Sequence, residues 1–438
     1  MALKLSFFEA AFGPLKTAFS YIKDYWWTVA PFLLGFGSYW AWINLKRQEY
    51  ISAMKWVTLE IKPPADVVKS PKMAENIFSA LHSVYIKAAT WKERFFKGKV
   101  QDWFSFEIVS VGGEMRFYVK APEAYRNFIE SQIFAQYSDA EIKESEDYIN
   151  NLPEHLPNDE FDLFGTELIF TKPDAYPLKT YPEFEESPNA KETENKRTDP
   201  LSPLAEQIST LDQGEHIWVQ LIVRGTSGDW VKKAQSEIDK MMGREAKVEA
   251  DFLSKAVEGF SGLITSAIPS ISAGEERKEE KKELTPGQLT PGQRVVLEAI
   301  EKKIAKLGFK SGIRFIYIAK KDSFHGSHIS GVIGMFKQFY SNNLNTFRPN
   351  SLTITASRGW LPWLFPSDKG FRAKAEEFVR KRRIYSDYRN RSFIKQSVIL
   401  NTEELATLWH LPGAGVKAPL FPRVESKKGQ PPAGLPIK

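Results

Sequence analysis

The chain has 438 residues, of which 42% are hydrophobic, 13% aromatic and 26% charged, a profile typical of a globular protein with two or three domains. It contains no cysteine, which excludes disulfides, thiolate zinc sites, iron–sulfur clusters and cysteine nucleophiles. The net charge of +6 allows attraction to anionic lipid or nucleic acid without requiring either.

Residues 25–45 form a stretch without charge that is rich in aromatic side chains. Because about 20 apolar residues in a helix cross a ~30 Å hydrocarbon core, this stretch predicts a transmembrane helix. A buried core helix and a cleavable signal peptide are the alternatives, and they fit the tryptophan content and the missing cleavage site less well. The predicted membrane-anchoring side chains, which match aromatic belts at the two headgroup levels, are Trp26, Trp27, Trp40 and Trp42.

Residues 1–24 are predicted to form an amphipathic helix that lies in the membrane interface. Apolar side chains recur there at spacings of three and four, as at Phe12, Leu15 and Phe19. Basic residues are slightly more numerous after the predicted span than before it, which favours a cytoplasmic location for the rest of the chain.

Residues 54–150 predict a first α+β module. Strand-like alternation and helical periodicity follow the order βαββαβ, which is the ferredoxin-like pattern. The predicted elements are strands at 54–61, 103–110, 114–120 and 141–148, and helices at 72–86 and from 122. Gly112 and Gly113 between the two middle strands indicate a hairpin.

Residues 151–215 read as an irregular acidic connector with a short strand at 166–171, and a second α+β module is predicted over 216–400. Its predicted elements are strands at 216–223, 313–319 and 352–355, helices at 227–243, 294–308 and 328–340, and a flexible insertion at 244–292. A short helix and a Pro-rich tail complete 401–438. The predicted fold class is therefore α+β, with a transmembrane helix, two ferredoxin-like modules and an extended tail.

No enzyme signature is found in the sequence. The phosphate-binding pattern G-x-x-x-x-G-K-[ST] is missing, so ATP hydrolysis by this chain is not expected. His325 and His328 are three residues apart but have no third ligand at metal spacing. The acidic pair at 403–404 is interpreted as the start of a helix. We therefore predict no catalytic activity, no metal and no cofactor.

Residues 369–395 contain the highest concentration of basic residues, interleaved with aromatic ones. Such a mixture grips phosphates and stacks on bases, which indicates nucleic-acid binding. Contact with anionic lipid or an acidic protein, and a solvated helix whose aromatic side chains lie in the core, remain open alternatives. The predicted contact residues are Lys374, Arg380, Lys381, Arg382, Arg383, Arg389 and Arg391.

Two stretches resemble a known family. They are the segment 57–148, which contains FEIVSVGGEMRFYVKAPEAYRNFIESQIFAQYSDAEI, and the C-terminal part with ILNTEELATLWHLP (399–412) and SKKGQPP (426–432). Over about half of the chain they resemble the amino-terminal region of membrane-anchored HerA-type ATPases, which are similar to the coupling proteins of conjugative type IV secretion and occur in small-genome bacteria. In that family the tail leads into a nucleotide-binding motor domain, whereas this sequence carries no Walker motif.

The resemblance implies a membrane platform whose motor is a separate chain, or a fragment of a longer ATPase. The Pro-rich stretch 412–436 is then expected to be an extended arm that docks on the motor. The predicted docking residues are Leu405, Trp409, Leu411, Pro412, Lys427 and Lys428.

The predicted function is a non-catalytic, single-span platform in the inner membrane that belongs to a DNA-translocation or type IV secretion-like assembly and recruits a separate P-loop ATPase. The alternatives are an envelope-associated scaffold or lipid-binding protein without a nucleic-acid role, and an enzyme with an unrecognised site. The predicted partners are the membrane bilayer, a HerA-type or coupling-protein-like ATPase, DNA and a second copy of the chain.

Overall fold

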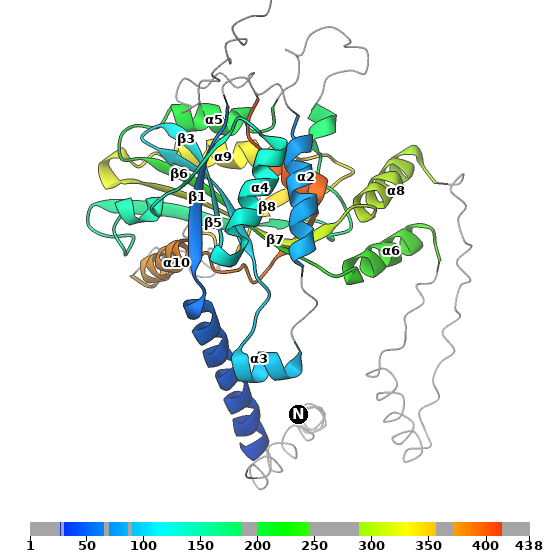
Figure 1. The fold of residues 1–438 in the computed structure, drawn as a ribbon, viewed down its shortest axis with the longest axis horizontal. Coiled ribbons are helices and arrows are strands. Elements are labelled where there is room, and N and C mark those ends of the chain that lie inside the picture. Colours follow the sequence, from blue (N-terminus) through cyan, green and yellow to red (C-terminus); the bar gives the residue numbers. More distant parts are fainter. Residues whose placement is uncertain are drawn as a thin grey trace, which may run out of the picture. The chain divides into compact units, whose positions relative to one another are not determined.

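The chain divides into two compact units, whose described elements are drawn in Figure 1. Unit 1 comprises Met1–Lys55 and Ile86–Asp102, and unit 2 comprises Trp56–Tyr85 and Trp103–Lys438. The computed structural model describes residues 27, 30–64, 70–85, 90–184, 199–244, 289–355 and 371–413.

Unit 2 is built on one antiparallel sheet, which has nine strands within the described residues. The strands are β1 (Trp56–Lys62), β2 (Phe104–Val111), β3 (Glu114–Pro122), β4 (Glu141–Glu144), β5 (Phe161–Phe170), β6 (His216–Gly225), β7 (Gly308–Lys320), β8 (Phe347–Pro349) and β9 (Val398–Asn401). Their order is β4-β1-β3-β2-β6-β7-β5-β8, and β9 pairs with β7.

The two halves of this sheet repeat one topology. Read from the outer strand inwards, the first half runs β4-β1-β3-β2 and the second runs β8-β5-β7-β6, so each half places its four strands in the order 4-1-3-2. The second strands of the two halves, β2 and β6, pair with each other and join the halves into one sheet. The first hairpin turns at Gly112 and Gly113, whose φ angles of 60° and 81° are conformations that glycine adopts without strain.

Helices cover both faces of the sheet. The α-helices of unit 2 are α2 (Lys72–Leu81), α4 (Arg126–Gln136), α5 (Ser202–Ser209), α6 (Asp229–Met241), α8 (Pro291–Ile304), α9 (Gly326–Lys337), α10 (Phe371–Arg389) and α11 (Thr402–Leu408). The 3₁₀ turns are η1 (His82–Val84), η2 (Glu123–Tyr125), η3 (Tyr148–Asn151), η4 (Tyr181–Phe184) and η7 (Lys321–Ser323). Five helices, α2, α4, α5, α9 and α11, share the main hydrophobic core with the sheet. The helix α10 packs on the opposite face, and α6 packs with α8 in a smaller cluster.

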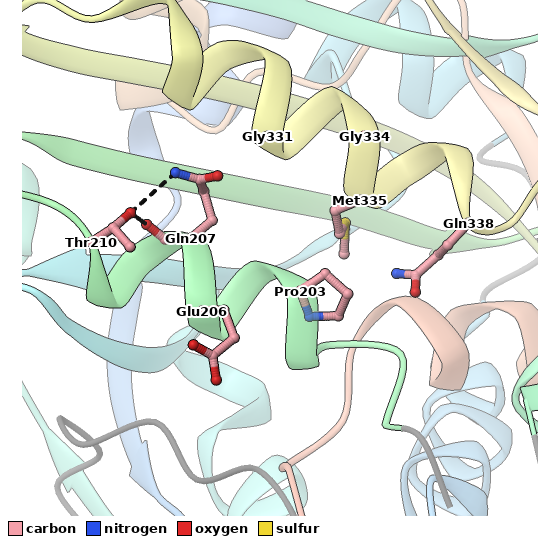
Figure 2. A pocket seen from close by; sticks show the side chains of 8 residues that line it. All are labelled: Pro203, Glu206, Gln207, Thr210, Gly331, Gly334, Met335 and Gln338. Carbon is pink, nitrogen blue, oxygen red and sulfur yellow. Dashed lines mark hydrogen bonds between the residues drawn. The ribbon is translucent and has the colours of Figure 1, made fainter.

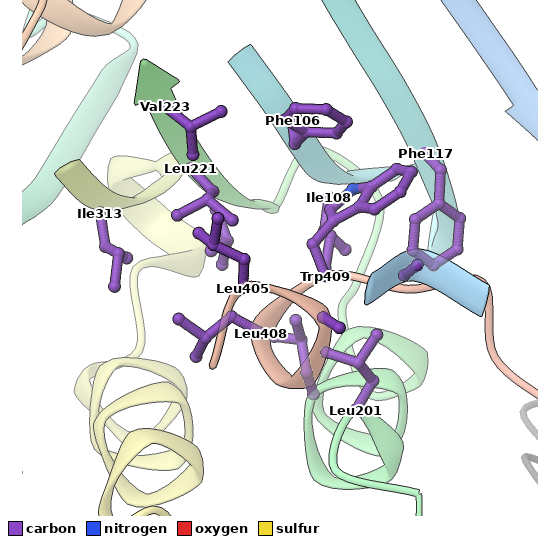
Figure 3. Close-up of a cluster of buried hydrophobic side chains, with 14 of the residues drawn as sticks. Phe106, Ile108, Phe117, Leu201, Leu221, Val223, Ile313, Leu405, Leu408 and Trp409 are labelled. Carbon is purple, nitrogen blue, oxygen red and sulfur yellow. The ribbon is translucent and has the colours of Figure 1, made fainter. Parts of the chain in front are cut away.

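Strand alternation decides which side chains reach each face. On β2 and β3, Phe106 and Phe117 lie in the main core, whereas Glu107 and Tyr118 point to the face that α10 covers. Figure 3 shows the main core, where Trp409, the residue that follows α11, packs between the strands and helices. Its ring centroid lies 4.8 Å from that of Phe106 and 6.1 Å from that of Phe117.

Unit 1 contains a helix over residues 30–53 and the short helix α3 (Trp91–Lys97). The start of α3 is fixed by a capping box, in which the Thr90 hydroxyl accepts from the backbone N–H of Glu93 and the Glu93 carboxylate accepts from that of Thr90. Gly98 ends the helix in the left-handed conformation, with φ of 62°.

The predicted transmembrane helix is wrong, because no helix among the described residues is long and apolar enough to cross a membrane. Residues 30–45 carry no charge, but their tryptophan, tyrosine, glycine and serine residues lower the mean hydropathy. Lys46, Arg47 and Glu49 follow in the same helix. The predicted interfacial helix at 1–24 and Trp26 lie outside the described residues.

The sheet runs without a break through both predicted modules and includes part of the predicted connector. The strand β5, which the prediction shortened and placed in the connector, lies between β7 and β8 in the second half. The predicted strand at 352–355 is not a strand. Instead, the hydroxyls of Thr353 and Thr355 accept hydrogen bonds from the backbone N–H groups of Glu167 and Gly165 on β5, at 3.1 and 2.9 Å.

The last residues of the predicted flexible insertion at 244–292 belong to the described fold. Leu289 is buried, Thr290 caps α8, and α8 begins at Pro291. Residues 245–288 of that prediction, and the Pro-rich tail from 414 onwards, lie outside the described residues.

Candidate functional site

Arg391 of the predicted basic segment is buried at 1% exposure and pairs with two carboxylates. Its guanidinium donates to both oxygens of Glu107 at 3.0 and 3.1 Å, and to both oxygens of Asp147 at 2.6 and 2.8 Å. Glu107 also accepts from the Tyr148 hydroxyl at 2.8 Å. The guanidinium N–H groups of Arg391 are thus used inside the protein. The predicted contact of Arg391 with a nucleic acid is therefore corrected, because the side chain is buried.

The charges of this cluster are mutually stabilised. Burial alone would raise the pKa of the Glu107 carboxyl, but the Arg391 guanidinium and its hydrogen bonds hold that pKa below its usual range. The pKa of Asp147 is lowered in the same way, by Arg391 and Lys120 acting against burial. The cluster therefore joins β2, the turn at 147–151 and the segment after α10 as a buried ionic network, which is a structural role.

The other basic residues of the segment divide into paired and exposed groups. The Lys381 ammonium lies 2.8 Å from both Asp162 and Glu377. Arg389 is half-buried and reaches Asn150 at 3.4 Å, and Arg380 is also half-buried. The exposed side chains are Lys374, Arg382 and Arg383, of which Arg382 lies over the Phe378 ring and Arg383 is 3.8 Å from Asp387. The predicted phosphate-binding surface is thus reduced to these three.

The predicted motor-docking residues are placed in the interior. Leu405, Trp409 and Leu411 are 0–1% exposed, and Pro412 is also buried. These side chains hold α11 against the sheet, so they could contact a partner only if α11 detached. Lys427 and Lys428 lie outside the described residues.

Figure 2 shows an open groove of about 450 Å³ between α5 and α9. It is lined by Pro203, Glu206, Gln207, Thr210, Gly331, Gly334, Met335 and Gln338. A Cβ atom at Gly331 would lie 1.8 Å from the Gln207 amide oxygen, so a larger residue there would displace the Gln207 side chain. Among these described lining residues Glu206 is the only titratable one, so the groove itself offers no acid–base pair.

The two histidines considered for a metal site lie near this groove. His328 Nε2 is 3.5 Å from the Glu215 carboxylate, and its Nδ1 is 2.7 Å from the Gln207 amide nitrogen. Within the described ranges, no group of three or more histidine, aspartate or glutamate side chains could hold a metal ion.

Unit 1 presents a different surface, made of large apolar side chains that are exposed. On the helix at 30–53 and on residue 27 the exposed fractions are 61% for Trp27, 81% for Phe32, 66% for Leu33, 71% for Leu34, 64% for Phe36, 39% for Tyr39, 48% for Trp40, 42% for Trp42 and 57% for Leu45. On α3, Trp91 is 60% and Phe96 62% exposed. Exposed apolar groups in such number mark a contact surface. We call this set the aromatic surface.

An aromatic cluster connects the two helices of unit 1. The Trp42 indole N–H donates to the Phe95 backbone carbonyl at 3.0 Å. The Phe95 ring stacks on Tyr39 and Trp91, with ring centroids 5.9 and 5.2 Å apart. The sequence prediction identified the tryptophans of the longer helix but missed Trp91 and Phe96, although the basic and aromatic pattern WKERFFKGK (91–99) could have indicated them.

The family described as a domain of unknown function (DUF8128) matches residues 41–420. The chain belongs to this family. The DUF8128 region includes Trp42, α3 and every strand of the sheet from β1 to β9, so part of the aromatic surface lies within it. No curated protein matches the chain.

Proposed function

We propose that this chain is a non-catalytic scaffold that attaches peripherally to an anionic membrane. In this proposal the helix at 30–53 enters one leaflet of the bilayer without crossing it, and unit 2 stays outside the lipid. The observation that supports it is the aromatic surface. Four of its side chains, at residues 32, 33, 34 and 36, are 64–81% exposed. Moving one such apolar side chain out of water gains about 1.5–3 kcal/mol.

The order of side-chain types along the helix supports entry from one side. Aliphatic and phenylalanine side chains occupy 32–36, Tyr39, Trp40 and Trp42 follow, and Lys46 and Arg47 come next. Acyl chains favour the aliphatic and phenylalanine side chains, the headgroup boundary favours tyrosine and tryptophan, and lipid phosphates favour lysine and arginine. At 1.5 Å per residue, the distance from Phe32 to Trp42 is about 15 Å, which is the depth of about half a hydrocarbon core.

The distribution around the helix favours lipid over a protein partner. Successive residues of a helix are rotated by about 100°, so Phe32, Leu33 and Leu34 point in different directions. One docked helix buries a single stripe, as in a coiled coil, whereas lipid surrounds all sides.

Charge supports an anionic lipid surface. Over residues 30–55 and 90–102 there are seven basic and three acidic side chains, which gives a net charge of +4. Lys92, Arg94 and Lys97 on α3 are exposed beside Trp91 and Phe96. Each Lys or Arg near an anionic leaflet contributes about 1 kcal/mol.

Flotation with lipid vesicles tests the proposal. The full chain should float with vesicles of phosphatidylcholine and phosphatidylglycerol, and less with phosphatidylcholine alone. Replacing Phe32 and Phe36 together by serine should weaken the partition about 100-fold, because two apolar side chains are lost from the acyl region. The preference for anionic vesicles should shrink at high salt.

A matched control uses exposed apolar residues of unit 2. Phe378→Ser with Leu352→Ser removes side chains that are 45% and 70% exposed, and it should leave flotation unchanged. A wild-type chain that fails to float, or a control that weakens binding as much as the unit 1 variant, would contradict the proposal.

The DNA-translocation role and the recruitment of a P-loop ATPase stay predictions. Three exposed basic residues, Lys374, Arg382 and Arg383, remain for the first, and the tail that was expected to carry the second lies outside the described residues. The resemblance to HerA-type ATPases likewise stays a prediction.

A further inference from the structure

A pocket of about 240 Å³ lies between the helix at 30–53 and α3. It is lined by Tyr39, Trp40, Ile43, Arg47, Trp91, Arg94 and Phe95. Its lining thus combines aromatic side chains with two arginines, Arg47 from the longer helix and Arg94 from α3. Because all seven residues belong to unit 1, the pocket is formed within that unit.

The two arginines bring uncompensated positive charge to this pocket. Neither Arg47 nor Arg94 forms an ion pair among the described residues. Two of the three acidic side chains of the described part of unit 1 are engaged elsewhere, since Glu49 pairs with Lys46 at 2.7 Å and Glu93 pairs with Lys99 at 3.3 Å while it caps α3. A planar guanidinium matches a phosphate with two parallel hydrogen bonds, which a lysine cannot do.

We infer that this pocket binds the phosphate headgroup of an anionic phospholipid, with Arg47 and Arg94 donating to the phosphate oxygens. Trp40 and Trp91 then contact the glycerol backbone, where amphipathic rings are favoured. The inference rests on the proposed membrane attachment and adds to it a defined lipid site.

The pocket's size and place on the helix fit a headgroup and not a whole lipid. A volume of about 240 Å³ is smaller than the 300–1,000 Å³ of typical ligand pockets, so acyl chains must lie outside it. The exposed side chains of Phe36 and Leu33 are available to them, one to two helical turns towards the N-terminal side of Trp40. Arg47 follows Trp40 by seven residues, so about 10 Å along the helix separates the acyl boundary from the phosphate.

Calorimetric titration with a monomeric short-chain lipid tests the site. The full chain should bind dihexanoyl-phosphatidylglycerol below its micelle concentration. Replacing Arg47 and Arg94 together by glutamine should weaken this binding tenfold or more, because charge-assisted hydrogen bonds to the phosphate are lost. Glycerol 3-phosphate should bind much more weakly than the lipid, because it lacks the acyl chains.

The matched control removes the same amount of charge from α3 at positions that do not line the pocket. The double variant Lys92→Gln with Lys97→Gln should bind the short-chain lipid within about twofold of the wild type. The arginine variant and this lysine variant should both bind anionic vesicles more weakly than the wild type, to a similar degree, because each loses two positive charges. Equal binding of the short-chain lipid by the wild type and the arginine variant would overturn the lipid site, as would equally tight binding of glycerol 3-phosphate. If the lipid site is overturned by either result but the full chain still floats with vesicles, the proposed membrane attachment is unaffected. Short-chain binding without any flotation would support the pocket and contradict the membrane attachment.

Discussion

Arg391→Met is expected to lower the free energy of unfolding by about 3–5 kcal/mol, the range found when one partner of a buried ion pair is removed. Methionine retains much of the side-chain volume, so the loss comes from the charge. Glu107 would be left buried without its bidentate partner, and Asp147 would lose two hydrogen bonds. Urea unfolding of the full chain, followed by far-ultraviolet circular dichroism, measures the difference.

The pH dependence of this variant distinguishes charge from packing. In the wild type the pKa of Glu107 is lowered, so its contribution is present at neutral pH and is lost as the pH falls through the lowered value. In Arg391→Met the unpaired Glu107 has a raised pKa and regains stability when protonated. The difference in the free energy of unfolding between the wild type and Arg391→Met should therefore become smaller as the pH falls from 7 to about 4.

Arg383→Met is the matched control, since the Arg383 side chain is 60% exposed and 3.8 Å from Asp387. Its effect should be about 0.5 kcal/mol or less. Equal effects of the two substitutions, or a gap that does not change with pH, would show that the network around Arg391 does not stabilise the fold as argued.

Trp409→Ala is expected to cost about 3–5 kcal/mol of stability, because it opens a cavity under α11 where the indole contacts Phe106 and Phe117. The residue was predicted from sequence to dock a motor, so this substitution separates the two interpretations. A docking residue could be replaced with little effect on unfolding, whereas a core residue could not. The measurement is the urea midpoint of the full chain.

Trp91→Ala is the control for this prediction, because the same side chain is removed from a position that is 60% exposed. Its cost should be about 1 kcal/mol or less. If Trp409→Ala unfolded at the wild-type urea concentration, the account of α11 as part of the core would be wrong.

Local patterns in the sequence predicted many of the elements but not how they assemble. The Gly112–Gly113 turn and the periodicity of α2, α6 and α9 depend on near neighbours, so they were visible. The pairing of β2 with β6 joins strands more than 100 residues apart, and alternation in one strand does not reveal its partner. The two halves were therefore read as separate modules.

The strand at 161–170 shows why the connector was misread. Only 166–171 was recognised, because Asp162 and Gly165 interrupt the β-propensity of the first part. In the fold, Gly165 faces Ile384 of α10, and a Cβ there would lie 3.0 Å from that side chain. The tight contact that favours a small residue at 165 thus comes from a helix far along the chain.

A sequence does not report burial, so some of the predicted contact residues lie in the interior of the fold. Arg391 and Lys374 carry the same charge in one basic run, but Arg391 is buried against Glu107 of β2 and Lys374 is exposed to solvent. For residues 25–45, the lack of charge indicated a membrane contact, but aromatic and small residues reduce the hydropathy that a spanning helix needs. Trp91 and Phe96 complete that surface from a separate segment.

The most direct test of the account measures how deep unit 1 lies in a membrane. Since the chain has no cysteine, a single spin label can be placed at Phe36→Cys, Asn44→Cys or Ser386→Cys in otherwise unchanged full chains. With anionic vesicles present, relaxation by oxygen should be strongest at residue 36, and relaxation by a water-soluble nickel complex strongest at residue 386. Residue 44, about 12 Å along the helix from residue 36, should give intermediate values. A label at residue 36 that stays as accessible to nickel as the label at residue 386, on protein shown to be vesicle-bound, would contradict attachment through the aromatic surface.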